Sequence, residues 1–177
     1  MSEEYEEPEF SLISKFPTFE IRKYPDSIQA RVRVEGENWR GSTGGFRRIA
    51  AYIFGRNEGN QQIAMTAPVH IWNEGGGTNM AFIMPSGYSM SDLPRPNDEG
   101  VRIVNTEGRF FAALTFSGLS GNRKANRLKK QLSEMVIEAG FKTSGAAILA
   151  VYDDPTSTLP FKRRNEILLP IQYREEK

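Results

Sequence analysis

The sequence predicts an α+β fold in which two ββαββ repeats, related by a pseudo-twofold axis, form an eight-stranded, antiparallel, barrel-like sheet with two helices. Eight segments have the alternation or the short apolar runs of strands, and two longer segments have helical periodicity. The order hairpin, helix, hairpin occurs over residues 19–84 and again over residues 101–171. Each repeat would have one apolar sheet face and one apolar helix stripe to bury, so we expect the two repeats to share a core.

The first repeat opens with a predicted β-hairpin. Residues 19–24 and 28–34 both alternate apolar and polar side chains, as half-buried strands do. Pro25 and Asp26, which lie between them, are residues typical of a turn. We therefore expect these two strands to pair with each other.

A helix and a second hairpin complete this repeat. Residues 43–54 change to helical spacing, and their apolar stripe consists of Phe46, Ile49, Ala50 and Ile53. Strands are expected at residues 65–72 and 79–84, around a turn of three glycines. Pro68, within the first of these strands, has no N–H to donate, so we expect the ladder of hydrogen bonds to break there.

The second repeat follows a connector, residues 85–100, that contains three prolines. Its expected elements are strands 101–106 and 109–117, a helix over 121–140, and strands 146–152 and 163–171. The short Glu107-Gly108 turn predicts that the first two of these strands pair as a hairpin. The helix is the most strongly periodic segment of the chain, and Gly140 marks its end.

Length and charge limit the classes of protein to which the chain can belong. Its 177 residues favour a single domain, expected over residues 17–177 after a loosely held N-terminal arm of residues 1–16. The 23 basic and 22 acidic residues nearly cancel, which gives no general attraction to nucleic acid. Without cysteine there is neither a disulfide nor a thiolate metal site. The acidic start is unlike a secretory leader and no apolar run reaches about 18 residues, so we expect a cytoplasmic protein without a membrane span.

Four motifs follow one another along the chain, and together they resemble one known family. They are FEIRKYP (19–25), GFRRIAAYIFGRN (45–57), QIAMTAPV (62–69) and RRNEI (163–167). Over residues 17–171 the sequence resembles the SOUL, or haem-binding protein, family. The resemblance implies a SOUL-type domain that binds haem or another tetrapyrrole non-covalently in a hydrophobic groove, as a carrier, buffer or sensor.

The resemblance places the groove along the first helix and its neighbouring strands. The residues expected at the tetrapyrrole are Phe46, Arg47, Ile49, Ala50, Ile53, Met80, Phe82 and Tyr152. Apolar side chains would contact the ring, and Arg47, with Arg48 beside it, would reach the ring's carboxylates through charge-assisted bonds. The alternative is that the apolar residues are ordinary core and the arginines are solvated.

His70 is the only histidine of the chain and therefore the only histidine that could ligate haem iron. In the alternation of its strand it lies opposite Val69 and Ile71. If that apolar face points into the core, His70 points outward. SOUL proteins often bind a tetrapyrrole without a histidine ligand, so we treat axial ligation by His70 as the less favoured alternative.

Glu166 supports a second hypothesis. Residues 163–166 carry charge into the last strand, and the favoured interpretation is an internal salt bridge with hydrogen bonds that pin the loop 153–162. The family is also related to gyrase-inhibitory-like, drug-sensing domains, in which a buried carboxylate holds flat aromatic cations; Glu166 would be that carboxylate, in a binding or hydrolytic domain.

Known nucleophile and nucleotide-binding motifs are missing from the sequence, which favours a binding protein over an enzyme. A third hypothesis is a protein-interaction module without a ligand.

Overall fold

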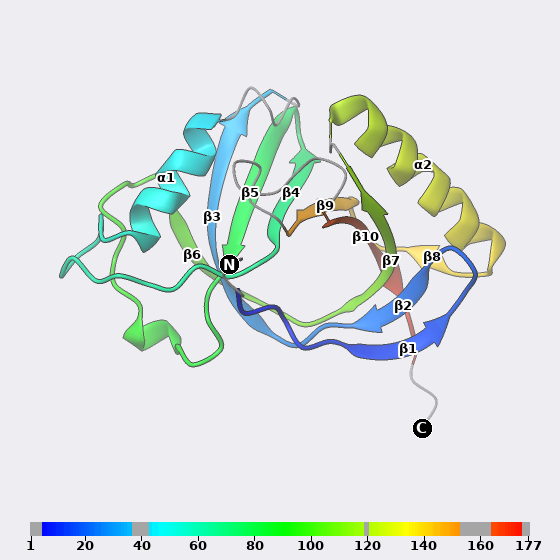
Figure 1. The fold of residues 1–177 in the computed structure, drawn as a ribbon, viewed down its shortest axis with the longest axis horizontal. Coiled ribbons are helices and arrows are strands. Elements are labelled where there is room, and N and C mark those ends of the chain that lie inside the picture. Colours follow the sequence, from blue (N-terminus) through cyan, green and yellow to red (C-terminus); the bar gives the residue numbers. More distant parts are fainter. Residues whose placement is uncertain (1–4, 37–42, 119–120, 153–163, 175–177) are drawn as a thin grey trace. The chain divides into compact units, whose positions relative to one another are not determined.

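The computed structural model describes residues 5–36, 43–118, 121–152 and 164–174. The chain divides into two compact units, the first of residues 1–8 and 26–107 and the second of residues 9–25 and 108–177. Each unit combines antiparallel strands with one α-helix that contacts them (Figure 1). The predicted α+β class with two helices is therefore confirmed.

The first unit is built on four strands in the spatial order β4-β5-β3-β6. Their bounds are β3 (Ser27–Glu35), β4 (Val69–Glu74), β5 (Gly77–Ile83) and β6 (Arg102–Thr106). Helix α1 (Thr43–Ile53) contacts β3 and β5, and a short 3₁₀ helix, η2 (Met90–Asp92), lies in the connector before β6. Every residue of β5 is buried, so the core of this unit lies at that strand.

Helix α1 approaches the sheet closely at Gly45. A Cβ atom at this position would lie 2.9 Å from Cγ1 of Val34 and 3.4 Å from the sulfur of Met80. The glycine therefore lets the helix backbone come nearer to the strands than a larger residue would. This close approach brings α1, the helix of the predicted groove, directly against β3 and β5.

The second unit has the strand order β1-β2-β7-β10-β9, and β8 also pairs with β10. The bounds are β1 (Ser11–Lys15), β2 (Glu20–Lys23), β7 (Phe110–Ser117), β8 (Lys142–Thr143), β9 (Ile148–Val151) and β10 (Arg164–Gln172). Helix α2 (Asn122–Glu138) contacts β7, β8 and β10. It buries Ala125, Leu132 and Val136 at helical spacing, and the chain leaves it at Gly140, whose φ is 95°.

All eight predicted strands are present, but the predicted number was wrong, because the described residues form ten. The additional strands are the two-residue β8 and β1, which lies within the predicted N-terminal arm and pairs with β2. Short segments rich in polar residues carry too little periodicity for strands to be predicted from the pattern alone.

Two of the predicted hairpins were also wrong. Within the described residues, β2 pairs with β1 and β7 rather than with β3, and β6 pairs with β3 rather than with β7. Both errors fall at the turns Pro25-Asp26 and Glu107-Gly108, where the chain passes from one unit into the other. A turn signal predicts a change of direction but does not select the pairing partner. The β4–β5 hairpin and the pairing of β9 with β10 are confirmed.

The predicted break at Pro68 is confirmed, because β4 begins only at Val69. The Ala67–Pro68 peptide bond is cis. Before the proline, the backbone N–H of Ala67 donates to the carbonyl of Glu6, and the hydroxyl of Thr66 donates to the carbonyl of Ile83. Side-chain and loop contacts thus take over from the regular ladder in this stretch.

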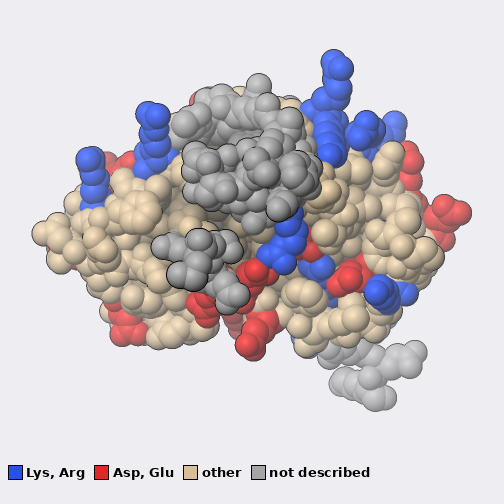
Figure 2. Space-filling model, viewed as in Figure 1, with Lys and Arg blue, Asp and Glu red and all other residues tan. Residues whose placement is uncertain are grey.

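The surface carries charges of both signs. Lys and Arg side chains are interspersed with Asp and Glu on the face in Figure 2. Among the helices of the described residues, none combines the length and the apolarity that crossing a membrane requires.

Candidate functional sites

The residues predicted to line the groove lie in two different environments. Ile49 and Ile53 of α1 are 0% and 1% exposed, and Met80 and Phe82 of the adjacent strand β5 are each 2% exposed. These four side chains therefore form core of the first unit. They support α1 from below rather than line an open surface.

The outer side of α1 carries an apolar stripe of Phe46, Ala50 and Phe54, here called the α1 stripe. Phe46 is 38% exposed and Phe54 is 64% exposed, while Ala50 is half-buried. The N–H of Phe54 donates to the carbonyl of Ala50 (3.0 Å), so helical bonding extends to Phe54 and the spacing of four keeps all three on one side. The ring of Phe46 also contacts Phe82, with 5.4 Å between centroids. Sequence reasoning missed Phe54, although its position four residues after Ala50 was a usable signal.

The two neighbouring arginines of α1 differ in their contacts. Arg47 is exposed and lies three residues before Ala50, at the border of the α1 stripe. Arg48 instead binds Asp98 of the connector through Nε–Oδ2 (2.6 Å) and Nη2–Oδ1 (2.8 Å). Hydrogen bonding from Arg48 lowers the pKa of Asp98 to about 2. The Tyr52 hydroxyl donates to the carbonyl of Pro94 (2.8 Å), so two contacts fasten the connector to α1.

His70 is buried in β4 and only 6% exposed. Its neighbours Val69 and Ile71 are buried as well, and Ala81 lies opposite it on β5. The less apolar face of the strand is therefore covered at His70 as well, and axial ligation by this residue stays the less favoured prediction. No group of three or more His, Asp or Glu side chains with metal-ligand spacing occurs in the part of the chain that the structure describes.

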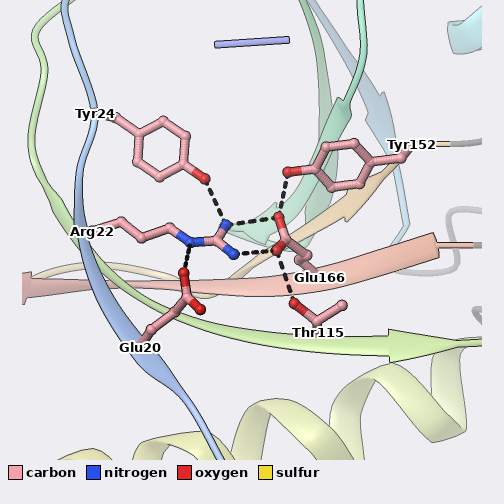
Figure 3. Close-up of polar contacts among 6 residues, drawn as sticks. All are labelled: Glu20, Arg22, Tyr24, Thr115, Tyr152 and Glu166. Atoms are coloured by element: carbon pink, nitrogen blue, oxygen red, sulfur yellow. Dashed lines mark hydrogen bonds and ion pairs between the residues drawn. The ribbon is translucent and has the colours of Figure 1, made fainter. Parts of the chain in front are cut away.

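The second unit holds a buried ion pair between Arg22 of β2 and Glu166 of β10 (Figure 3). The two residues are 5% and 4% exposed. Arg22 donates from Nη1 to Oε1 of Glu166 (2.9 Å) and from Nη2 to Oε2 (2.6 Å), which is a bidentate arrangement. Thr115 of β7 donates from Oγ1 to Oε2 (3.0 Å), and the hydroxyl of Tyr152 donates to Oε1. Residues from distant parts of the chain thus donate hydrogen bonds to both oxygens of one carboxylate.

Further groups surround the guanidinium of Arg22. It donates from Nη1 to the hydroxyl of Tyr24 (2.9 Å) and from Nε to Oε2 of Glu20 (2.8 Å). Its Cζ lies 4.2 Å from the centroid of the Phe10 ring, a distance typical of a cation–π contact. The arrangement is called the Arg22–Glu166 cluster below and comprises Phe10, Glu20, Arg22, Tyr24, Thr115, Tyr152 and Glu166.

Burial and pairing oppose each other in this cluster. Burial raises the pKa of Glu166, but hydrogen bonds from Arg22 and Tyr152 outweigh it and leave the pKa below its ordinary value. Burial alone would lower the pKa of Arg22, yet its contacts with Glu166 and Tyr24 raise it above the ordinary value. Burial and the nearby charge of Glu166 raise the pKa of Tyr152. The pair is therefore ionised at neutral pH, and Tyr152 remains a hydrogen-bond donor.

The internal salt bridge predicted for Glu166 is present, but the residue that forms it was not foreseen. Arg22 looked like an exposed residue of an alternating strand, whereas it is buried and paired across 144 positions of sequence. No local pattern marks such a long-range pair. Arg163 and the loop 153–162 lie outside the described residues. Tyr152, predicted beside the groove of α1, belongs to the second unit and contacts Glu166.

Solved structures share this fold. The C-terminal domain of EcmrR is 10% identical, with a TM-score of 0.68 over 87% of this chain and 96% of that domain. The structure of SAV2435 bound to tetraphenylphosphonium is also 10% identical, with a TM-score of 0.51 over 87% of this chain and 93% of SAV2435. At such low identity the likeness concerns the fold alone. The protein thus falls in the class of α+β domains that share this strand and helix arrangement.

Sequence relationship narrows the class to one family. Residues 5–170 match the SOUL heme-binding protein family, so this chain belongs to that family. Heme-binding protein 2 of Mus musculus and that of Homo sapiens are each 28% identical over 167 residues, which cover 86% of this chain and 77% of each relative. The resemblance to SOUL proteins is thereby confirmed, and haem binding is supported at the level of the family.

Proposed function

We propose that this chain binds haem or a related tetrapyrrole non-covalently on the α1 stripe, and that it serves as a carrier, buffer or sensor of that group. The observation that carries the proposal is the exposure of Phe46 and Phe54 on a helix whose other large apolar side chains are buried. Aligned exposed aromatic side chains often mark a ligand or interaction surface. Membership of the SOUL family supports a tetrapyrrole as the ligand.

The residues around the α1 stripe suit a tetrapyrrole in two respects. Phe46, Ala50 and Phe54 offer apolar contact to the face of a flat ring. Arg47 is exposed beside them, and its guanidinium would pair with a propionate of the ring. Arg48 is less suited to that role because it already binds Asp98.

The proposal does not require an iron–histidine bond. Ligation by His70 would require a side chain that is 6% exposed to leave the interior of the first unit. Binding would then depend on the ring and its carboxylates rather than on the metal. We expect metal-free protoporphyrin to bind about as tightly as hemin, and His70→Ala to leave the Soret band of the hemin complex unchanged.

Absorbance titration of the purified protein with hemin and with protoporphyrin tests the proposal. Phe54→Asp should weaken the binding of both about tenfold or more, which corresponds to about 1.4 kcal/mol. Leu12→Asp is the matched control, because Leu12 is 55% exposed on β1 of the second unit. If neither ligand shifts its absorbance at micromolar protein, the proposal fails and an interaction module without a ligand is favoured. Equal weakening by both variants would mean that the α1 stripe is not the site.

The role of Arg47 is tested in the same titration. Arg47→Ala should weaken the binding of hemin. The dimethyl ester of hemin, which lacks the propionate charges, should bind the variant and the wild type equally. Arg102→Ala is the control, since Arg102 is an exposed arginine of β6 in the same unit. A loss for both ligands alike would contradict a propionate contact.

The alternative of a binding site for flat cations at Glu166 has less support. SAV2435, which shares the fold, was solved with a phosphonium cation bound. In this chain, however, Arg22 already engages both oxygens of Glu166. A cation from solution would have to displace a bidentate, buried partner.

A further inference from the structure

We propose that the residues around Arg22 in the Arg22–Glu166 cluster form a binding site for a guanidinium cation. In the native chain the guanidinium of Arg22 itself occupies this site and thereby excludes cations from solution. Carboxylate oxygens and a phenol oxygen accept hydrogen bonds from the edge of the guanidinium, and an aromatic ring covers its face. These are the groups with which proteins bind cationic ligands. The proposal is independent of tetrapyrrole binding, because the cluster lies wholly within the second unit.

The carboxylate does not depend on Arg22 for its orientation. Thr115 and Tyr152 each donate a hydrogen bond to one oxygen of Glu166. The backbone of Glu166 is held between Thr115 of β7 and Ala150 of β9 by antiparallel pairing. Removal of the Arg22 side chain would therefore leave an oriented, desolvated carboxylate in place.

The contacts around Arg22 suit a planar cation better than an ammonium. Three nitrogens donate in the plane of the guanidinium, to Glu20, Tyr24 and Glu166. Phe10 lies over the face of the group. A planar fork with donors on its edges satisfies all of these contacts at once, whereas an ammonium is a compact, strongly hydrated point charge. The ligand class is thus a guanidinium or a similar planar cation.

Solvent lies close to the buried pair. Arg22 is 5% exposed, but Phe10, which covers it, is 39% exposed. The side chain of Glu20 is 27% exposed. A small cation would therefore have a short path to Glu166 once the Arg22 side chain is removed.

Thermal unfolding of Arg22→Ala with methylguanidinium tests this inference. We expect the variant to melt below the wild type, because it leaves Glu166 buried without its cation. Methylguanidinium at about ten times its dissociation constant should raise the melting temperature of the variant by about 3–6 °C. It should leave the wild type nearly unchanged, since Arg22 already fills the site.

Two controls separate specific occupation from a general salt effect. Methylurea has the same shape without the charge, and methylammonium has the charge without the planar fork, so each should raise the melting temperature of Arg22→Ala much less. The double variant Arg22→Ala/Glu166→Gln should not respond to methylguanidinium. An equal shift in the wild type and Arg22→Ala, or a shift that persists in the double variant, would overturn the proposal.

A second variant covers the case in which Arg22→Ala does not fold. Arg22→Gln removes the charge but keeps a polar stem, and it is measured with the same three solutes. A shift with methylguanidinium that disappears on adding Glu166→Gln supports the proposal. The absence of such a shift in folded Arg22→Gln overturns it.

Discussion

The two units share a spatial order of strands, but the first exposes aromatic side chains and the second buries a pair of charged ones. Read from β6, the first unit is ordered β6-β3-β5-β4; read from β2, the order in the second is β2-β7-β10-β9, with β1 added outside β2. In each unit a strand leads into the α-helix, and two later strands pair with each other. The strand β6 comes from later in the chain and β2 from earlier. The predicted repeats 19–84 and 101–171 therefore do not coincide with the two units, and the repeat and its pseudo-twofold relation stay predictions.

The difference lies in what each unit buries. Among the described residues, both charged side chains that are buried, Arg22 and Glu166, belong to the second unit. The first unit buries uncharged polar residues such as Asn79 and Thr78 and exposes the aromatic rings of Phe46 and Phe54. The comparison teaches that similar topology can present an apolar surface in one unit and enclose an ion pair in the other. We expect substitutions at the exposed aromatic side chains to affect ligand binding, and substitutions in the buried ion pair to affect the free energy of unfolding.

The largest expected effect follows from breaking the ion pair. Glu166→Ala should lower the free energy of unfolding by about 3–5 kcal/mol, because it leaves the guanidinium of Arg22 buried without its partner. The double variant Arg22→Met/Glu166→Leu, which removes both charges, should be clearly more stable than Glu166→Ala. Urea unfolding measures all three proteins. If the free energy of unfolding of Glu166→Ala lay within about 1 kcal/mol of that of the wild type, the buried ion pair would contribute no more than a surface pair. The proposed difference between the two units would then be contradicted.

The next effect separates the inner and outer sides of α1. Ile49→Ala removes a side chain that is 0% exposed and should cost about 2–5 kcal/mol. Phe54→Ala truncates a side chain that is 64% exposed and should change stability by about 0.5 kcal/mol or less. The same urea measurements apply, with hemin titration as the second readout. Equal costs would show that Phe54 is part of the core and not of an open stripe.

Acid should weaken the second unit through Glu166. Burial opposes ionisation of this carboxyl, but hydrogen bonds from Arg22 and Tyr152 hold its pKa below the ordinary value in the folded protein. Its contribution to stability is therefore complete above the pKa of the unfolded chain and is lost as pH falls through the lower, folded value. The wild type should lose urea resistance below about pH 4.5 more steeply than Arg22→Met/Glu166→Leu, which lacks this carboxyl. Identical acid profiles would contradict the shift.

The smallest effect concerns the pair that fastens the connector to α1. Arg48 and Asp98 are both 39% exposed in their side chains, so solvent screens their attraction. Arg48→Ala should cost about 0.2–1 kcal/mol, and added salt should reduce that difference. A double-mutant cycle with Asp98→Asn measures the coupling. A coupling above about 2 kcal/mol would show that this pair resembles the buried one rather than a surface pair.

Local patterns predicted local structure well. The apolar spacing of Ile49 and Ile53 identified the helix and its buried side, and Pro68 marked the break before β4. The same patterns failed for partners that lie far apart in sequence. Pro25 marked a turn correctly, but the strands on its two sides belong to different units. Phe54 lay within the predicted helix, but it was left out of the predicted stripe, which included the buried Ile49 and Ile53.

The sequence alone determined the eight main strands, the two helices and the family, because each depends on residues that are close together or on motifs in a fixed order. Only the tertiary structure decided which strands pair, and it alone brought Arg22 to Glu166 across 144 positions. It also decided that His70 is buried while Phe46 and Phe54 remain exposed. Periodicity indicates which side chains share one face of a helix or strand. Burial and ion pairing depend instead on which other parts of the folded chain pack against that face.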